Sequence, residues 1–289
     1  MLTAKLRNPE LLVLPLGIAV AVLLYGLAVW FYQPDDSEMD SPLEVPPATA
    51  LLKVPARPDF RSMTDVKMKK DAFFSYLLPM IRNTNALVLA ERTFLERVSE
   101  RLERKGFLTE HDYAQLAVLA EKYRVPLPDE GLDQDTLTRL LRRCDVVPAS
   151  LVMAQAANES AWGTSRFALQ GNNFFGIWCF RPGCGLTPIR REAGFTHEVA
   201  RFPDVAAGVD YYVNTINTNN AYTHLRNIRE QLRRNDEQIT GMRLAEGLDK
   251  YSERGDAYVE EIKSMISFNE LSRYTNRTTD STANSTTSD

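Results

Sequence analysis

The segment from Ala156 to Trp178 reads "AANESAWGTSRFALQGNNFFGIW". It starts as an Ala-rich apolar stretch of helical character, reaches a single carboxylate at Glu159, and continues into a run that is dense in aromatic residues, Asn and Gly. A helix that simply ends in solvent does not need this composition. The environment of Glu159 is therefore the first question that the sequence poses.

The expected helix places Glu159 on an apolar stripe. Pro148 suits a first helical turn, and Val152, Ala156 and Glu159 follow at spacings of four and three. Gly163 is expected to end the helix, which leaves Glu159 in its last turns. There, desolvation and the negative end of the helix dipole disfavour the anion and raise the carboxyl pKa. A carboxyl group that stays protonated near neutral pH can act as a general acid.

The run after the helix combines two kinds of side chain that bind sugars. Aromatic faces stack on pyranose rings, and amides form hydrogen bonds with hydroxyl and acetamido groups. The same aromatic residues also fit a hydrophobic core, and an arbitrary helix glutamate usually meets solvent or an arginine. If this run binds a sugar, the candidate substrate-binding residues are Trp162, Gln170, Asn172, Asn173, Phe174, Phe175 and Trp178.

The motif "NESAWGTSRFALQGNNFFGIW" resembles the glucosaminidase family of bacterial cell-wall hydrolases, glycoside hydrolase family 73. The insertion "WCFRPGCGLTPIRR" and the helical region ahead of the motif are more particularly similar to its Bax-like branch, and the resemblance covers about residues 65–265. It implies a mainly α, lysozyme-like α+β fold with a small β-hairpin lobe. It also implies cleavage of the β-1,4 bond after N-acetylglucosamine in peptidoglycan, with Glu159 as the general acid. A lytic transglycosylase-type muramidase and a catalytically silent peptidoglycan-binding scaffold are the alternatives.

The second catalytic group has three candidates. The family offers a carboxylate base on the hairpin lobe, or a tyrosine in a route that uses the N-acetyl oxygen of the sugar. A hairpin is expected over residues 187–202, with Glu192 near its turn and Glu198 on its return strand, which favours Glu198 because a strand holds a side chain more firmly. Tyr251 aligns with the family tyrosine at a spacing one residue longer, and Tyr258 is expected to pack the closing helix.

The N-terminus predicts a membrane anchor. Residues 11–32 carry no charge and, at about 1.5 Å per residue, are long enough to cross a bilayer core of about 30 Å. Lys5 and Arg7 precede this segment and acids follow it, so residues 1–10 are expected in the cytoplasm and the rest in the periplasm, beyond the inner membrane. A cleaved signal peptide is the competing interpretation.

Composition excludes other classes of function. Lys and Arg total 34 against 38 Asp and Glu, giving a formal net charge of −4, so we expect no nucleic acid partner. The three histidines show neither HExxH nor Cys/His zinc spacing, so we expect no metal and no cofactor. Cys179 and Cys184 flank the turn "FRPG" and are predicted to form a disulfide, which suits an exported domain. Cys144 is expected as a small buried hydrophobe.

The remaining segments predict a tethered helical domain. Residues 33–61 are rich in Pro and acids and are expected to form an extended tether, and residues 272–289 a disordered tail. The domain between them, residues 62–271, should begin with a helix that is capped by Asp65 and bent or ended at Pro79. Further helices are expected at about 86–105, after the capping box Thr109–Asp112, over 135–143, and after Asp204.

Overall fold

The structure is a computed structural model that describes residues 54–129, 131–189, 194 and 196–275. The expected membrane segment, most of the expected tether and tail, and Glu192 lie outside the described residues. Within these ranges, no helix combines the length and the apolar character needed to cross a membrane. Two of the expectations above, the membrane anchor and the role of Glu192, therefore stay predictions.

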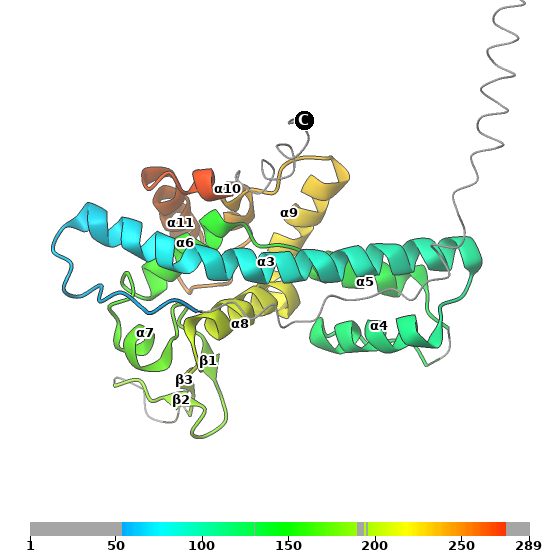
Figure 1. The fold of residues 1–289 in the computed structure, drawn as a ribbon, viewed down its shortest axis with the longest axis horizontal. Coiled ribbons are helices and arrows are strands. Elements are labelled where there is room, and N and C mark those ends of the chain that lie inside the picture. Colours follow the sequence, from blue (N-terminus) through cyan, green and yellow to red (C-terminus); the bar gives the residue numbers. More distant parts are fainter. Residues whose placement is uncertain (1–53, 130, 190–193, 195, 276–289) are drawn as a thin grey trace, which may run out of the picture. The chain divides into compact units, whose positions relative to one another are not determined.

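One long helix, α3 (Val66–Lys105), runs along the domain (Figure 1). Asp65 caps it as predicted, because its side chain accepts a hydrogen bond from the Met68 N–H at 2.7 Å. Of the predicted bend or end at Pro79, the end is wrong, since the helix continues through this residue to Lys105. Proline has no N–H, so the helix lacks one backbone hydrogen bond at this point. Buried residues on both sides of the proline, including Leu77 and Met80, stabilise the helix by packing.

Two shorter helices, α4 (Glu110–Lys122) and α5 (Gln134–Arg143), pack against α3. The capping box at the start of α4 is confirmed, with the Thr109 side chain and the Asp112 side chain bonded to each other's backbone N–H. Asp112 is fully buried and also pairs with Arg101 of α3. The predicted helix over 135–143 is confirmed as α5, which begins one residue earlier.

Helix α6 (Ala149–Glu159) lies at the centre of the domain. Every residue from 149 to 157 is buried. The helix packs against α3 and against three C-terminal elements, namely α10 (Gly241–Ala245), α11 (Asp256–Phe268) and the 3-10 helix η2 (Leu271–Tyr274). Its buried surface is therefore continuous up to its last turn, where Glu159 sits.

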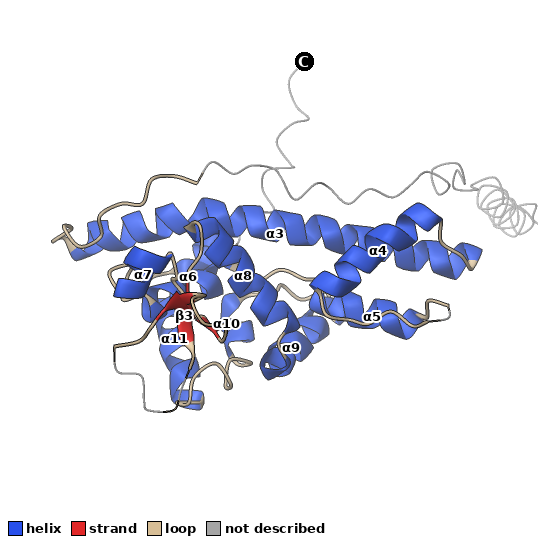
Figure 2. Ribbon diagram, turned by 90° about the horizontal axis from the view of Figure 1, so that it is seen from below, coloured by secondary structure: helices blue, strands red, loops and turns tan. Residues whose placement is uncertain are grey.

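A small β lobe follows the central helix. Helix α7 (Arg166–Gly171) lies beside a sheet of three short antiparallel strands in the order β1-β3-β2, which are β1 (Trp178–Cys179), β2 (Gly185–Leu186) and β3 (Glu198–Ala200). The return strand of the predicted hairpin is confirmed as β3, but its partner strands precede residue 187. Helices dominate the rest of the domain (Figure 2), so the prediction of a mainly α fold with a small β lobe is confirmed.

The second half of the scaffold consists of α8 (Val205–Thr218), the 3-10 helix η1 (Asn220–Tyr222) and α9 (Thr223–Arg234). Asp204 caps α8 as predicted by accepting a hydrogen bond from the Ala207 N–H at 2.8 Å. An apolar stripe of α8, which runs from Val205 to Ile216, is buried. Helix α8 packs along α3, and α9 packs on α5 and α10.

The packed domain extends beyond both predicted boundaries. Arg57, in the expected tether, donates hydrogen bonds to the carbonyls of Ala168 and Leu169 at 2.8 and 3.1 Å. Phe60 is 1% exposed and belongs to the core. At the other end, Tyr274 packs its ring 6.2 Å from that of Phe74. Arg57, Phe60 and Tyr274 therefore attach both flanking segments to the fold through contacts that the local sequence does not reveal.

A buried carboxylate joins three parts of the scaffold. Asp145, between α5 and α6, is 2% exposed and accepts hydrogen bonds from Arg233 at 2.7 and 3.0 Å. Arg92 and Arg229 lie 3.5 and 3.8 Å from the same carboxylate. Burial by itself would raise the pKa of Asp145, but the charges of Arg229, Arg233 and Arg92 outweigh it and hold the pKa below its ordinary value.

We predict that Asp145→Asn destabilises the domain by about 3–5 kcal/mol at pH 7, because it leaves buried Arg229 without its counter-charge. Urea unfolding measures the change. Asp135→Asn is the control, since Asp135 pairs with Arg139 at an exposed site and its loss should cost at most about 1 kcal/mol. Because the folded pKa of Asp145 is lowered, its contribution is complete above the unfolded pKa of about 3.9 and is lost as the pH falls through the folded pKa. Equal stability of wild type and Asp145→Asn at pH 7 would contradict this assignment.

Candidate functional site

Glu159 is the last residue of α6, so the helix ends four residues before the predicted end at Gly163. Ser160 closes the helix with its side chain. Its hydroxyl donates to the Ala156 carbonyl at 2.6 Å and accepts from the Gly163 N–H at 2.8 Å. These bonds tie the turn back onto the helix and fix the direction in which Glu159 leaves it.

The turn after Glu159 holds three successive residues in the left-handed region. Ala161, Trp162 and Gly163 have φ values of 49°, 59° and 74°. This conformation costs the first two about 1–2 kcal/mol each. A Cβ on Gly163 would lie 2.6 Å from the Phe60 ring, so only glycine fits there. The surrounding packing therefore has to hold the turn in place.

Trp162 supplies much of that packing. Its ring makes edge contacts with the rings of Phe73 and Phe74 at centroid distances of 5.6 and 5.5 Å, and the Lys70 ammonium lies 5.0 Å from its centre. The sequence predicted a sugar contact for Trp162. In the structure its ring packs against side chains of α3. We therefore infer that Trp162 stabilises the turn.

The carboxyl group of Glu159 lies between a tyrosine and a glycine. The Tyr258 hydroxyl, on α11, donates a hydrogen bond to Oε1 at 2.8 Å. A Cβ built on Gly176 would lie 3.5 Å from Oε2, so the main chain of the "NNFFG" segment borders the other oxygen. The φ of Gly176 is +63°, a conformation that favours glycine. The two motifs of the segment, "NES" and "NNFFG", therefore meet at this carboxyl.

A buried chain of hydrogen bonds supports Tyr258. The Tyr212 hydroxyl donates to Oε1 of Gln155, and Nε2 of Gln155 donates to the Tyr258 hydroxyl at 2.9 Å. Tyr258 then donates to Glu159, so all three bonds run in one direction towards the carboxyl. Gln155 is fully buried, four residues before Glu159 on the same helix. Such bonds strengthen one another in an apolar interior.

Burial raises the pKa of Glu159 above its ordinary value, while the hydrogen bonds from Tyr258 and Asn158 lower it by less. The negative charge of Glu261 adds to the increase. A larger fraction of the carboxyl is therefore protonated near neutral pH than for an exposed glutamate. The increase has the direction that the sequence predicted, and burial is its main cause.

Tyr251 is close to this group but bonds elsewhere. Its hydroxyl donates to the Phe175 carbonyl at 2.9 Å, and its ring stacks on that of Tyr258 with a centroid distance of 5.4 Å. Tyr222 lies next to it at 5.9 Å. Burial raises the pKa of Tyr251 well above that of a free phenol, so it remains a protonated donor. Its bond holds the residue before Gly176 in position.

The two asparagines of "NNFF" hold the backbone together. Asn173 is 1% exposed, donates to the carbonyls of Ile177 and Ala200 at 2.9 Å each, and accepts from the N–H groups of Phe175 and Ile177. Asn172 has a left-handed φ of 51° and donates to the Phe202 carbonyl at 3.0 Å. Both amides are occupied within the protein. The predicted sugar contacts of these side chains are replaced by bonds that join the loop to the β lobe.

The predicted aromatic contacts divide into buried and exposed residues. Phe174 and Phe175 are 0% and 2% exposed, and the Phe175 ring stacks on that of Tyr212 at 4.2 Å. Core packing covers both rings, so neither ring face is open to a sugar in this structure. Trp178 is 53% exposed and stacks on His197 at 4.1 Å. Gln170 is also exposed, so these two predicted binding residues are open to a ligand.

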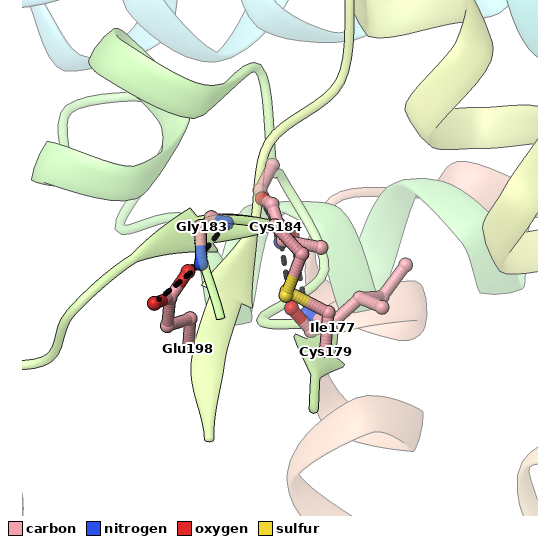
Figure 3. Close-up of a disulfide and its surroundings, with 8 residues drawn as sticks. Ile177, Cys179, Gly183, Cys184 and Glu198 are labelled. Atoms are coloured by element: carbon pink, nitrogen blue, oxygen red, sulfur yellow. Dashed lines mark hydrogen bonds between the residues drawn. A yellow bond between two sulfur atoms is a disulfide. The ribbon is translucent and has the colours of Figure 1, made fainter. Parts of the chain in front are cut away.

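The predicted disulfide between Cys179 and Cys184 is present, with a Cα–Cα distance of 6.2 Å. Glu198 lies beside it (Figure 3) and accepts hydrogen bonds from the N–H groups of Gly183 and Gly185 at 3.0 and 2.7 Å. Ligand atoms of the two cysteines and Glu198 lie within 4.8 Å of one another, but sulfurs joined in a disulfide are not thiolate ligands. In this arrangement Glu198 fastens the disulfide loop, and its role as a base stays a prediction.

The third cysteine, Cys144, is fully buried, as expected. Its Sγ lies 3.5 Å from the Val88 carbonyl, and burial raises the pKa of the thiol to about 12. A thiol in this environment is a core side chain and not a nucleophile.

Gln155, Tyr212 and Tyr258 were not predicted from the sequence as partners of Glu159. Gln155 had a readable signal, since it is a polar residue one turn before Glu159 in a mostly apolar helix. The two tyrosines had none, because their spacing along α8 and α11 is that of ordinary core residues. Their contact with Glu159 depends on how these helices pack.

The chain is similar to known proteins over the part that contains this site. Residues 135–271 match the family described as mannosyl-glycoprotein endo-beta-N-acetylglucosaminidase, a range that contains Glu159, Glu198, Tyr251 and Tyr258. The chain is also 32% identical over 213 residues to "Protein bax" from Escherichia coli (strain K12), which covers 74% of each chain. No solved structure matches the chain.

We predict that Tyr258→Phe raises the pKa of Glu159, because it removes a donor that stabilises the carboxylate. A carbon-13 NMR titration of labelled glutamate carboxyls measures it, with Glu159→Gln identifying the signal. Wild-type Glu159 should titrate above the ordinary glutamate value of about 4.3, and the variant higher still. Tyr113→Phe, at an exposed tyrosine of α4, is the matched control and should leave the titration unchanged. An unchanged or lower pKa in Tyr258→Phe would exclude the hydrogen bond as a determinant.

Proposed function

Because the chain belongs to the Bax-like branch of the glucosaminidase family, we propose that it is a membrane-anchored peptidoglycan hydrolase. The family places it among the glycoside hydrolases. In our proposal it cleaves the β-1,4 bond after N-acetylglucosamine, on a lysozyme-like scaffold, with Glu159 as the general acid. The observation that carries this proposal is the partly buried carboxyl of Glu159, which accepts a hydrogen bond from the neutral Tyr258 hydroxyl at 2.8 Å.

The geometry around Glu159 suits proton donation. The protonated carboxyl gives its proton to the glycosidic oxygen as the bond to the leaving sugar breaks. Tyr258 then donates its hydrogen bond to the carboxylate that remains. Burial favours the protonated form of Glu159 before the reaction, and the Tyr258 hydrogen bond stabilises the carboxylate after it.

The exposed aromatic residues of the β lobe support glycan binding. Trp178 and Phe180 are 53% and 72% exposed, and the Trp178 ring is held flat against His197. A fixed, exposed indole is suited to stack on a pyranose ring. Gln170 adds an exposed amide on α7, which packs against the same lobe. We propose that the glycan strand lies along this lobe and reaches Glu159.

We propose a periplasmic location with residues 11–32 as the inner-membrane anchor. The support is the uncharged segment with positive charges before it, together with the disulfide in the β lobe. Structural disulfides persist in oxidising compartments. Separation of membrane and soluble fractions, with and without residues 1–32, tests the anchor.

We predict that Glu159→Gln lowers hydrolysis of purified sacculi by about 10²–10⁴-fold while the fold is kept, because the side chain is nearly isosteric but has no proton to give. Release of reducing ends measures activity, and circular dichroism measures the melting temperature. Glu260→Gln, at an exposed site on α11, is the control and should keep full activity. Near-normal hydrolysis by Glu159→Gln with a normal melting curve would refute the assignment.

Mass spectrometry of the digested sacculi identifies the bond that is cut. New reducing N-acetylglucosamine ends support the proposed glucosaminidase. Products that end in 1,6-anhydro-muramic acid would instead indicate a lytic transglycosylase. Unchanged muropeptides with retained binding to sacculi would indicate a silent scaffold.

Both Glu198 oxygens accept hydrogen bonds from backbone N–H groups, which occupy the carboxylate within the β lobe. For the second catalytic group, we therefore favour the route that uses the sugar's N-acetyl oxygen. We therefore predict retention of the anomeric configuration in the freshly released end, read by proton NMR. Glu198→Gln should lower the melting temperature more than kcat, and Tyr251→Phe should lower kcat by releasing the Phe175 carbonyl. Inversion together with a severe kcat loss in Glu198→Gln would show that Glu198 activates water.

A further inference from the structure

Five arginines gather around a cavity at the junction of α4, α5 and α9. The cavity has a volume of about 180 Å³, and its charged lining consists of Arg124, Arg139, Arg142, Arg143 and Arg226. No carboxylate lines it. Thr223, at the start of α9, also lines it, and its hydroxyl accepts a hydrogen bond from Arg226 at 3.1 Å and donates to the Asn220 carbonyl at 2.8 Å. The proposed glycosidase chemistry at Glu159 uses none of these residues.

Two of the five arginines have acidic partners. Arg139 pairs with Asp135 at 3.3 Å, and Arg142 with Glu230 at 3.4 Å. Arg124, Arg143 and Arg226 form no ion pair with any carboxylate among the described residues. Arg226 is only 3% exposed, and buried charges are ordinarily paired. The cavity therefore holds an uncompensated positive charge.

Backbone carbonyl groups at the ends of two helices compensate part of this positive charge. Arg143 donates to the carbonyls of Tyr123 and Arg124 at the end of α4, at 2.9 and 2.7 Å. Arg226 donates to the Ile216 carbonyl in the last turn of α8 at 2.9 Å. Each helix end supplies about half a negative charge. Against three guanidinium charges, roughly two positive charges remain.

The positive charges of the arginines around the cavity repel one another. Burial lowers the pKa of Arg226 to about 10, and the positive charges of Arg143, Arg229 and Arg142 contribute to this decrease. Burial also lowers the pKa of Arg143, together with the charges of Arg124, Arg142 and Arg139. An anion in the cavity would relieve this repulsion.

We propose that this cavity is a binding site for a phosphate group. A phosphate carries about −1.5 to −2 charges at pH 7, which matches the remaining charge, whereas a single carboxylate carries only one. The planar guanidinium group of arginine can also donate two parallel hydrogen bonds to phosphate oxygens. The Arg124 guanidinium makes no hydrogen bond with the described residues, so its donors are available to a ligand. The source of the phosphate is a soluble phosphoester or an anionic lipid headgroup.

Calorimetric titration of the full-length chain with inorganic phosphate at constant ionic strength tests the site. We expect saturable binding that weakens by about tenfold or more in Arg124→Gln/Arg139→Gln, since both side chains are exposed and their loss leaves the core intact. Arg82→Gln/Arg181→Gln removes the same charge at exposed positions that do not line the cavity and should bind as wild type. Glu159→Gln should also bind phosphate normally, which separates this test from that of the hydrolase.

Three results would overturn the proposal: no saturable binding by wild type, equal weakening in both double variants, or acetate binding as tightly as phosphate. Sedimentation with phosphatidylglycerol vesicles then distinguishes the sources. Vesicle binding that phosphate displaces and Arg124→Gln/Arg139→Gln weakens supports a lipid headgroup. Saturable phosphate binding without vesicle binding supports a soluble phosphoester.

Discussion

The burial of helix α6 along residues 149–157 is the constraint on which the candidate site depends. Helices α3, α10 and α11 cover it, and every residue from 149 to 157 is buried. The carboxyl at its last residue, Glu159, therefore emerges from an apolar interior and not from a surface helix. That position supplies the desolvation that raises its pKa. A surface helix with the same sequence motif would carry an ordinary glutamate.

The segment after α6 builds the other side of the site through its backbone. Ser160 closes the helix, three left-handed residues turn the chain, and Asn173 ties the following loop to β3. The polar residues of this segment thus bond to main-chain groups, and the result is the placement of Gly176 against Glu159. Polar residues in a binding motif can serve the geometry of the site without touching the ligand.

Sequence reasoning succeeded where the signal is local. The caps at Asp65, Thr109 and Asp204 and the disulfide across a four-residue turn each depend on neighbours in the chain. It failed where tertiary packing decides. Pro79 does not end its helix because buried side chains on both sides hold it, and the burial of Phe174 comes from contacts with α3 and not from its own motif. The Tyr258 contact with Glu159 spans 99 residues, so no local pattern encodes it.

The choice of a tyrosine as the partner of Glu159 has a physical consequence. An arginine at the same place would add a positive charge, hold the carboxylate in its anionic form and remove the proton that a general acid must give. A phenol donates a hydrogen bond without a charge, and burial raises the pKa of Tyr258 so that it keeps its own proton. Gln155 and Tyr212 orient this donor from the interior. The site can thus stabilise the anion after proton transfer while burial still favours the acid before it.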